Sequence, residues 1–570
     1  MNKYNSLANM AASGSWPTFQ PPDHLDVYDT RGASQDIQLA ITTMTGNINH
    51  QQPQVYLLSS NDAAFWLQQS FAQIPQDVSP ATGNVALDAM LNTYGSSIQG
   101  LIVYDPNSSD SINVATMLAG QRDGMVVSPS LAKTLEGPPH KLPVITDLSI
   151  YNWKNRIQAY TWAERNLLKN SAATLIAGLD PNISGALRSF LVATRTFIYW
   201  LDAGNCIPDI FNGFVSECGL MQRILSEFPA GTTHLGWFIN EPQGVKFTSK
   251  AAMPVLASDF FENLEVWTSV QTVGTGLALS SATTPPLSSA TTSQPAPSSS
   301  SGSLTSAAAG SSPSTASEPG SSTSSASSSS SGSLTSAGAG PASSTGTVSY
   351  STPKAYVSFT ISDGDNLQYN QHRMLALWKD PARGTLPIGW TISPSLVQTA
   401  PSLAAYYSST MTTNDELIAG PSGVGYMYPS EWPQAQLPAF LNVTGQTMQA
   451  MKLALIEVLD SGSGQAFVNP ALQTTYVDVL APFGVKGILS GSSQSQSTWK
   501  KISGVPVLQN LGLGDSVSKT VSLIQKASAQ YLNVYIMAWS MTPTNLQQVV
   551  QQLGNQYQIV KPSSLLAMLP

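Results

Sequence analysis

The sequence predicts an α/β protein in which N-terminal Rossmann-like α/β domains precede a C-terminal (β/α) TIM-like barrel of roughly 7–8 strands. Three observations support this fold class. In the N-terminal half, short apolar strands alternate with amphipathic helices, the pattern of parallel sheets covered on both faces. Residues 272–352 are almost purely Ser, Thr, Ala, Gly and Pro, with Glu318 their only charged residue. Beyond them, apolar strands recur about every 27 residues, as in a (β/α) barrel.

The N-terminal region is predicted to hold one or more α/β domains over residues 21–147, after a disordered lead-in over residues 1–20. Predicted strands lie at 25–28, 54–58, 100–104, 124–127 and 143–145. The predicted helices between them span 34–44, 62–71, 85–94 and 114–119. No Gly-x-Gly-x-x-Gly motif follows any of these strands, so the sequence does not support a dinucleotide site.

A second, mixed α/β domain is predicted over residues 148–271. Its predicted elements are helices at 157–169, 186–201 and 220–228 and a strand at 234–239. Cys206 and Cys218, the only two cysteines, flank a loop-like stretch in this domain. A disulfide between them would add roughly 3 kcal/mol in the chain-entropy model, and the alternative is two buried free thiols.

The segment 272–352 is predicted to be a flexible Ser/Thr/Gly/Pro-rich linker. It contains an internal repeat, SSSSGSLTSAAAG at 298–310 and SSSSGSLTSAGAG at 328–340. Its apolar content is too small to offset the entropy lost on ordering. A Ser/Thr-rich segment with Pro also fits an O-glycosylated stalk, which favours export.

Composition limits the partners and favours an extracellular or cell-surface location. Only 10% of residues are charged, the net charge is −8 and no Lys/Arg cluster occurs, which argues against nucleic acid as a partner. No stretch of 18 or more apolar residues is present, so no membrane span is expected. No signal peptide is visible in MNKYNSLANMAASGSW, which leaves a removed leader, unconventional export or a cytoplasmic protein as alternatives.

The C-terminal domain, residues 353–570, is predicted to be the catalytic barrel. Its apolar strands fall near 355–361, 387–392, 416–420, 453–458, 485–489, 505–508, 532–538 and 557–560. A doubly wound open sheet is the alternative fold. In such barrels the working residues sit at the C-terminal ends of the strands.

Two loops in this domain concentrate residues suited to chemistry. After the third strand comes GPSGVGYMYPSEWP, Gly420 to Pro433, in which Gly and Pro fix the backbone around aromatic rings. Flat rings with polar tips suit sugar faces or a packed corner equally well. After the first strand comes Ser362-Asp363-Gly364-Asp365-Asn366.

These motifs resemble the GxGYxYP family of glycoside hydrolases. The stretch GVGYMYP fits Gly-x-Gly-Tyr-x-Tyr-Pro, and YVSFTISDGDN is similar to the family's strand with its Ser-Asp-Gly-Asp-Asn loop. The resemblance continues upstream in VYDTRG (Val27 to Gly32) and GWFINEPQGV (Gly236 to Val245). It implies the architecture above and a role in carbohydrate metabolism as an O-glycosyl hydrolase.

Asp363, Asp365 and Glu457 are the candidate catalytic residues, because glycoside cleavage needs one ionised and one protonated carboxyl group. Asp363 and Asp365 can divide these roles, or either can pair with Glu457. The alternative for Asp-Gly-Asp-Asn is a hydrogen-bonded turn. The alternative for Glu457, which lies in an apolar run, is a paired core carboxylate.

The predicted substrate-binding residues lie at strand ends or in the aromatic loop: Asn366, Trp390, Tyr426, Tyr428, Glu431, Trp432, Asp460 and Trp539. If the face shared by Tyr426 and Tyr428 points inward, both are core residues instead. Glu241, on the upstream strand after Trp237, either reaches the barrel mouth or holds a domain interface.

The sequence favours a glycosidase that binds a polysaccharide or oligosaccharide and needs no cofactor. A metal-dependent polysaccharide deacetylase is a weaker alternative, since its ion needs an Asp and two His at helical spacing. The barrel domain has one histidine, His372, and no pair of the chain's five histidines has that spacing, so no metal is expected. A carbohydrate-binding protein without turnover is the alternative of another class.

Overall fold

The computed structural model describes residues 16–208, 213–270, 353–461 and 466–570. The predicted linker, 272–352, and residues 1–15 of the predicted lead-in lie outside the described residues. Residues 16–20 are packed, in contrast to the predicted disorder. The Trp16 ring stacks on Phe190 with centroids 5.6 Å apart, and its indole donates a hydrogen bond to Thr268 Oγ1 at 3.4 Å. This aromatic contact holds the stretch against the helices.

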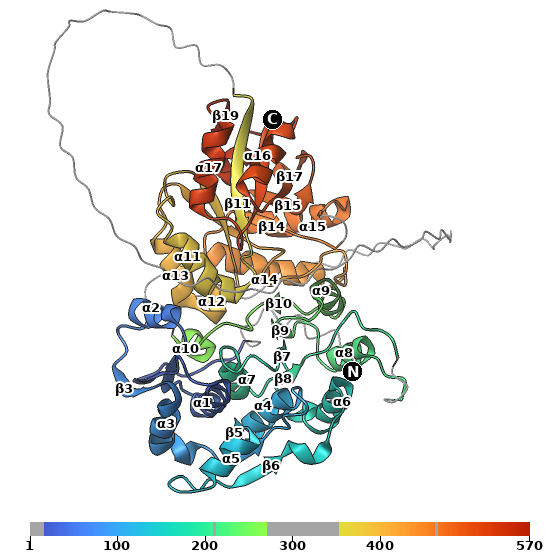
Figure 1. Ribbon diagram of the computed structural model, residues 1–570. Coiled ribbons are helices and arrows are strands. Elements are labelled where there is room, and N and C mark those ends of the chain that lie inside the picture. Colours follow the sequence, from blue (N-terminus) through green and yellow to red (C-terminus); the bar gives the residue numbers. More distant parts are fainter. Residues whose placement is uncertain (1–15, 209–212, 271–352, 462–465) are drawn as a thin grey trace, which may run out of the picture. The chain divides into compact units, whose positions relative to one another are not determined.

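The N-terminal region forms three all-parallel sheets (Figure 1). The first has the order β2 (Val55–Leu58), β1 (Leu25–Asp29), β3 (Gln76–Thr82). The second has the order β5 (Gly124–Val127), β4 (Gly100–Val103), β6 (Val144–Asp147). The third has the order β10 (Val255–Leu256), β9 (Thr233–Gly236), β7 (Leu175–Gly178), β8 (Phe197–Tyr199). An α/β fold with N-terminal parallel sheets is therefore confirmed.

Ten α-helices are described in this region: α1 (Gln35–Ile48), α2 (Asn61–Ser70), α3 (Ala86–Tyr94), α4 (Ser111–Arg122), α5 (Pro129–Leu135), α6 (Arg156–Asn166), α7 (Arg188–Ala193), α8 (Glu217–Ser226), α9 (Glu241–Lys250) and α10 (Leu264–Ser269). None of the described helices is long and apolar enough to cross a membrane. Cys206 and Cys218, which precede and enter α8, are joined by a disulfide with their Cα atoms 5.0 Å apart.

The helix predicted over 186–201 is wrong in its second half. The helix α7 ends at Ala193, Arg195 takes a positive φ of 54°, and the chain then enters strand β8. The residues of β8, Phe197 to Tyr199, are aromatic or β-branched and all three are buried, which suits a buried strand as well as a buried helix. Apolar runs of this length do not distinguish the two.

The C-terminal region contains a closed barrel of seven parallel strands. In order around the barrel they are β11 (Ala355–Ser362), β12 (Ile388–Ile392), β13 (Asp415–Ala419), β14 (Leu455–Val458), β15 (Gly487–Gln494), β17 (Val505–Gly514) and β18 (Tyr531–Met537). The barrel closes because β11 pairs with both β18 and β12. The predicted barrel is thus confirmed, and the open sheet is excluded.

A strand is also present at the eighth predicted position, but it does not complete the barrel wall. Strand β19 (Tyr557–Ile559) pairs with only the first three residues of β11, while β12 pairs farther along the same strand, at Thr360 and Ile361. These three pairs leave most of the eight-residue strand β11 without a partner in β19. A short strand that was not predicted, β16 (Trp499–Ile502), runs antiparallel to β17.

Helices surround the barrel strands (Figure 1). They are α11 (Met374–Trp378), α12 (Leu396–Thr399), α13 (Pro401–Ser409), α14 (Leu437–Ala450), α15 (Pro470–Leu480), α16 (Val517–Lys526), α17 (Pro543–Leu553) and α18 (Pro562–Ala567). A π-helical turn, Tyr369–Arg373, leads into α11. The outward-facing residues of β11, Val357, Phe359 and Ile361, are fully buried.

The barrel interior is polar along one strand. Residues Ser358, Thr360 and Ser362 occupy every second position of β11, and all three are buried. The hydroxyls of Ser358 and Thr360 donate to Asn533 Oδ1 on β18 at 2.7 and 2.9 Å, and Asn533 donates to Asn510 Oδ1 on β17 at 2.7 Å. Because buried polar groups must be paired, this network fixes the interior side chains below the strand ends.

Candidate active site

A cavity of about 490 Å³ lies at the C-terminal ends of the barrel strands. Its lining residues are Trp237, Glu241, Ser362, Asp363, Asp365, Asn366, Gln368, Pro421, Tyr426, Leu459, Ser492, Leu513, Tyr535, Met537 and Trp539. Five of the predicted site residues are among them: Asp363, Asp365, Asn366, Tyr426 and Trp539. The volume is within the range of small-ligand sites.

The Ser-Asp-Gly-Asp-Asn loop holds its two carboxyl groups at the cavity wall through its backbone. The amides of Asp363 and Gly364 both donate to Thr391 Oγ1 on β12, at 3.0 and 2.9 Å. A Cβ atom on Gly364 would lie 2.3 Å from the backbone nitrogen of Ile392, so only glycine fits there. These hydrogen bonds hold the loop against strand β12. Asp363 and Asp365, on either side of Gly364, then lie in the cavity wall.

The two aspartates have different surroundings. Asp363 accepts a hydrogen bond from the Trp539 indole at 2.6 Å, and its burial, together with nearby Glu241, raises its pKa to about 7. Asp365 is only 4% exposed, and burial with the neighbouring charge of Asp363 raises its pKa well above the usual range. The environment therefore favours an ionised Asp363 beside a protonated Asp365.

Glu457 lies inside the barrel and does not line the cavity. Its side chain on β14 is fully buried, with the hydroxyl of Ser362 donating to Oε2 and Asn510 Nδ2 donating to Oε1 at 3.4 Å. Burial raises its pKa to about 8. Glu457 is therefore a paired core carboxylate, the alternative to a catalytic role. Its hydrogen-bond partner Ser362 does line the cavity.

Glu241 and Trp237 enter the cavity from the third N-terminal sheet region. Glu241 is the first residue of α9 and follows the cap Asn240, whose side chain accepts from Gln243 N. Burial raises the pKa of Glu241, and its charge acts on both Asp363 and Asp365. The sequence left open whether Glu241 reaches the barrel mouth or holds a domain interface, and the structure places it in the cavity wall.

Tyr535 also lines the barrel cavity, although it was not predicted from the sequence. It lies on β18, and burial with the charges of Glu457, Asp363 and Asp365 raises its pKa well above the usual value. The only available signal was the alternation of polar residues along the neighbouring strand β11, which marks a polar barrel interior.

The GxGYxYP loop joins the barrel to β10. Val255 and Tyr426 exchange two backbone hydrogen bonds, at 3.0 and 2.8 Å, and the amide of Tyr428 donates to Ser249 Oγ at 3.0 Å. A Cβ atom on Gly425 would lie 2.7 Å from Pro254 Cβ and 3.2 Å from Val255 O. The second glycine of the signature is therefore needed for this close approach.

Replacing Gly425 tests whether the loop needs a glycine for its close approach to Pro254 and Val255. We expect Gly425→Ala to lower the free energy of unfolding by about 1–3 kcal/mol, the usual cost of overpacking a buried contact. The measurement is urea unfolding of the full chain followed by fluorescence. Gly95→Ala is the matched control, because nothing lies within 4 Å of its added Cβ. Equal stability of the two variants would show that the loop has room to move.

Trp390 and Trp432 are core residues, contrary to the prediction that they bind substrate. The Trp390 indole donates to Asp415 Oδ1 at 2.9 Å, and its ring packs edge-on against Trp378 of α11. Trp432 is 1% exposed and packs on Phe440 of α14. On β12 the side chains alternate, so Thr391 faces the loop while Trp390 faces the helices.

Tyr428, Glu431 and Asp460 are also absent from the cavity wall. Tyr428 is buried against the ring of Tyr426, with centroids 5.7 Å apart. Glu431 forms ion pairs with Lys246 and Lys250 of α9, at 3.2 and 3.7 Å. Asp460 accepts hydrogen bonds from the amide and hydroxyl of Ser430. These residues shape and brace the loop instead of lining the cavity.

A larger cavity, of about 1030 Å³, lies along α6 and α8 and contains none of the predicted site residues. Glu164 in its wall is already paired with Arg223, whose Nε lies 2.6 Å from Oε1. Its size alone does not make it a reaction site, because all of its described lining residues belong to the N-terminal region and none lies at the end of a barrel strand.

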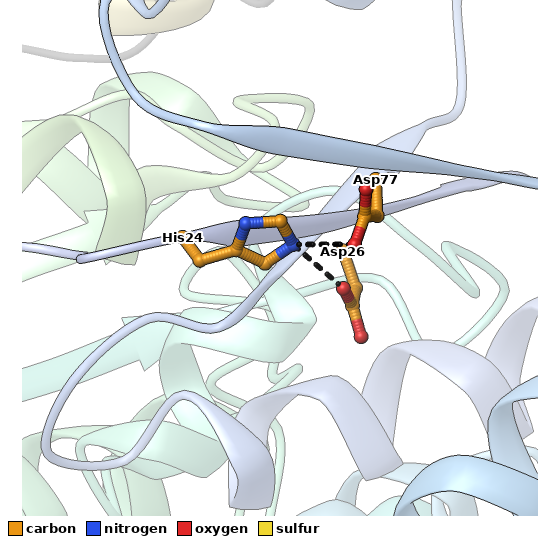
Figure 2. Close-up of side chains that lie close together, drawn as sticks. All are labelled: His24, Asp26 and Asp77. Carbon is orange, nitrogen blue, oxygen red and sulfur yellow. Dashed lines mark hydrogen bonds and ion pairs between the residues drawn. The ribbon is translucent and has the colours of Figure 1, made fainter.

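Within the described residues, one group of three potential metal ligands lies within 4.8 Å, formed by His24, Asp26 and Asp77 (Figure 2). His24 Nε2 lies 3.0 Å from Asp26 Oδ1 and 3.4 Å from Asp77 Oδ2. The Asp77 side chain is 86% exposed, and Asp26 also accepts from the Tyr94 hydroxyl at 2.7 Å. The His24 imidazole thus already has a hydrogen-bond partner in Asp26, and none of the three residues lines the barrel cavity.

The fold and cavity define an α/β protein with a carboxylate-lined site at the end of a parallel barrel. Four family models match it: "GxGYxYP_N 1st domain" over 24–96, "GxGYxYP_N second domain" over 98–171, "GxGYxYP third domain" over 173–269 and "GxGYxYP putative glycoside hydrolase C-terminal domain" over 353–569. The chain belongs to the GxGYxYP family, which confirms the resemblance of its motifs.

A solved structure described as a putative hydrolase from Bacteroides thetaiotaomicron VPI-5482 is similar to this chain. The TM-score is 0.72 at 19% sequence identity, and the match covers 96% of this chain and 95% of that one. At this identity the likeness shows a shared fold. No curated protein matches the chain.

Proposed function

We propose that this protein is a glycoside hydrolase whose barrel cavity cleaves a glycosidic bond by carboxylate acid–base catalysis. The observation that carries the proposal is the pair Asp363 and Asp365, which line one cavity in environments that separate their protonation states. The aromatic rings of Trp237, Tyr426 and Trp539 in the same wall suit the faces of a sugar. The family description, which names a putative glycoside hydrolase, points the same way.

In this proposal, Asp365 holds the proton that passes to the leaving oxygen, because burial and the charge of Asp363 keep it protonated. Asp363 is the ionised partner, since the Trp539 indole stabilises its charge at Oδ2. It acts on the sugar carbon or on the attacking water. Asn366 and Gln368 supply amide groups in the wall that can bond sugar hydroxyls. The barrel then works as TIM-like barrels do, from its C-terminal strand ends.

The pH dependence of turnover should show the ionisation of Asp363. Because its pKa is raised to about 7, turnover should rise as pH increases through that value, when the carboxylate forms. Trp539→Phe removes the hydrogen bond that lowers this pKa, so the acidic limb of kcat/KM should move to higher pH. Trp499→Phe, a change at a tryptophan outside the cavity, is the control. An acidic limb that stays in place in Trp539→Phe would show that Asp363 does not set it.

A carbohydrate-binding protein without turnover shares the same aromatic wall and is the second candidate. The paired, unequal carboxyl groups favour the hydrolase, since binding alone needs no separated protonation states. Secretion or cell-surface display is part of the proposal, because a disulfide such as Cys206–Cys218 persists in oxidising compartments.

The experiment is release of reducing ends from a panel of polysaccharides by the full chain, with binding of each glycan measured in parallel. Release that depends on Asp363 and Asp365 supports the hydrolase. Binding without release from any glycan supports the second candidate.

A further inference from the structure

The barrel cavity has an unusual charge balance. Among its described lining residues, three are carboxylic acids, Glu241, Asp363 and Asp365, and none is Lys, Arg or His. Glu241 and Asp363 raise the pKa of neighbouring acids, and Asp365 raises the pKa of Tyr426. The cavity therefore offers negative potential and no group that would bind an anionic sugar.

Basic residues near the cavity are engaged elsewhere. Lys246 and Lys250, on the same helix as Glu241, form ion pairs with Glu431. The Arg373 guanidinium donates to the carbonyl of Ala538 at 2.9 Å. The protein thus leaves the carboxyl groups of the cavity without a cationic partner among the described residues.

Two of these acids also lack side-chain donors. Among the described residues, Glu241 has no hydrogen bond or ion pair, and its raised pKa is caused by burial alone. Asp365, at 4% exposure, accepts no hydrogen bond from another side chain among the described residues. By contrast, Asp363 is held by the Trp539 indole. Glu241, which is half-buried in the cavity wall, is therefore left as an acceptor for a ligand that donates hydrogen bonds.

A bare divalent ion fits this arrangement poorly. An ion of that kind needs several ligand atoms around one point. In the part of the chain that the structure describes, the cavity acids do not form a group of three ligand atoms within 4.8 Å, whereas His24, Asp26 and Asp77 do. A larger molecule, with a positive charge at one end and hydroxyls elsewhere, can reach carboxyl groups that lie apart.

We propose that the cavity selects glycans bearing a free amino group, with Glu241 as the carboxylate that receives the ammonium. The proposal rests on the function proposed above and names its substrate class. The aromatic rings of Trp237 and Trp539 hold the sugar face, and the ammonium supplies the positive charge that the cavity wall lacks. Uronic acids and sulfated sugars are rejected, because their charge would face Glu241 and Asp363 in a wall whose described residues include no cation.

The test is calorimetric binding of monosaccharides to the full chain near neutral pH, in the gluco, galacto and manno series. Each series compares the 2-amino sugar with the parent sugar, the N-acetyl sugar and the uronic acid. In at least one series the amino sugar should bind about tenfold more tightly than the parent sugar, and the uronic acid more weakly than either. Added salt should weaken binding of the amino sugar most.

The variant Glu241→Gln should remove most of the preference for the amino sugar over the parent sugar. Glu136→Gln, the same change at an exposed residue outside the cavity, should keep it. Equal affinity for amino and neutral sugars in every series, or binding of a uronic acid as tight as that of the amine, would overturn the inference. So would saturation of the cavity by Mg²⁺ or Ca²⁺ alone, lost in Glu241→Gln.

The glycan panel separates this inference from the hydrolase proposal. Cleavage of glycans without any preference for amino sugars would overturn the inference and leave the hydrolase standing. A tenfold preference for amino sugars without cleavage of any glycan would support the selectivity of the cavity and contradict the hydrolase.

Discussion

Replacing either cavity aspartate should abolish most turnover while leaving the fold intact. We expect Asp363→Asn and Asp365→Asn each to lower kcat by about a hundredfold or more, the usual effect of losing a positioned acid or base. Asn has nearly the same volume as Asp and carries no charge. Because burial already disfavours the charged forms, neither change should destabilise the protein.

The measurement is reducing-sugar release on the best glycan of the panel, with unfolding followed in the same preparations. Asp478→Asn, at an exposed position of α15 outside the cavity, is the control and should keep parental turnover. If both cavity variants keep the parental rate, the Ser-Asp-Gly-Asp-Asn loop is only a hydrogen-bonded turn without a catalytic role. Unfolding of both would make the carboxylates structural.

The largest expected effect on stability is at Glu457. Its pKa rises from an ordinary value to about 8 on folding, so the folded state favours the protonated form. The stability that this provides is complete below the unfolded pKa and is lost as pH rises through about 8. The parent should therefore weaken from about pH 5 to about pH 9, with Glu457 contributing on the order of a few kcal/mol.

Glu457→Gln should remove this part of the pH dependence. The difference in free energy of unfolding between variant and parent should grow in favour of the variant as pH rises, measured by urea unfolding at a series of pH values. A residual slope is expected from Asp363 and Asp365, whose pKa values are raised too. Glu227→Gln, at an exposed site, should run parallel to the parent. A parallel curve for Glu457→Gln would show that Glu457 ionises freely in the fold.

Much of the barrel was predictable because each strand is a short apolar run that ends in polar residues. The Asp-Gly-Asp loop was placed correctly for the same reason, since the C-terminal strand ends of a barrel meet at one opening. The side chains that were misplaced, such as Trp390 and Trp432, depend on which face of an element they occupy. Spacing from a strand end does not determine that face for a residue inside a strand or a rigid loop.

The sequence alone could not decide whether the N-terminal region contributes to the cavity, since it left Glu241 either at the barrel mouth or at a domain interface. Glu241 and Trp237 reach the cavity because Val255 pairs with Tyr426, an arrangement between residues far apart in the chain. Likewise, Glu457 is a core residue because Ser362 and Asn510 surround it across the barrel. Such contacts between distant segments leave only weak local signals, here a Gly-Trp stretch and the alternating polar residues of β11.

Cleavage in water enriched in oxygen-18 tests the central claim most directly. The full chain is incubated with the most reactive glycan of the panel, and the products are examined by mass spectrometry. We expect one oxygen-18 atom at the new reducing end for each bond cleaved, and no labelled product with the Asp363→Asn and Asp365→Asn double variant. Unlabelled or unsaturated products, or equal labelling by the double variant, would contradict hydrolysis by these two carboxylates.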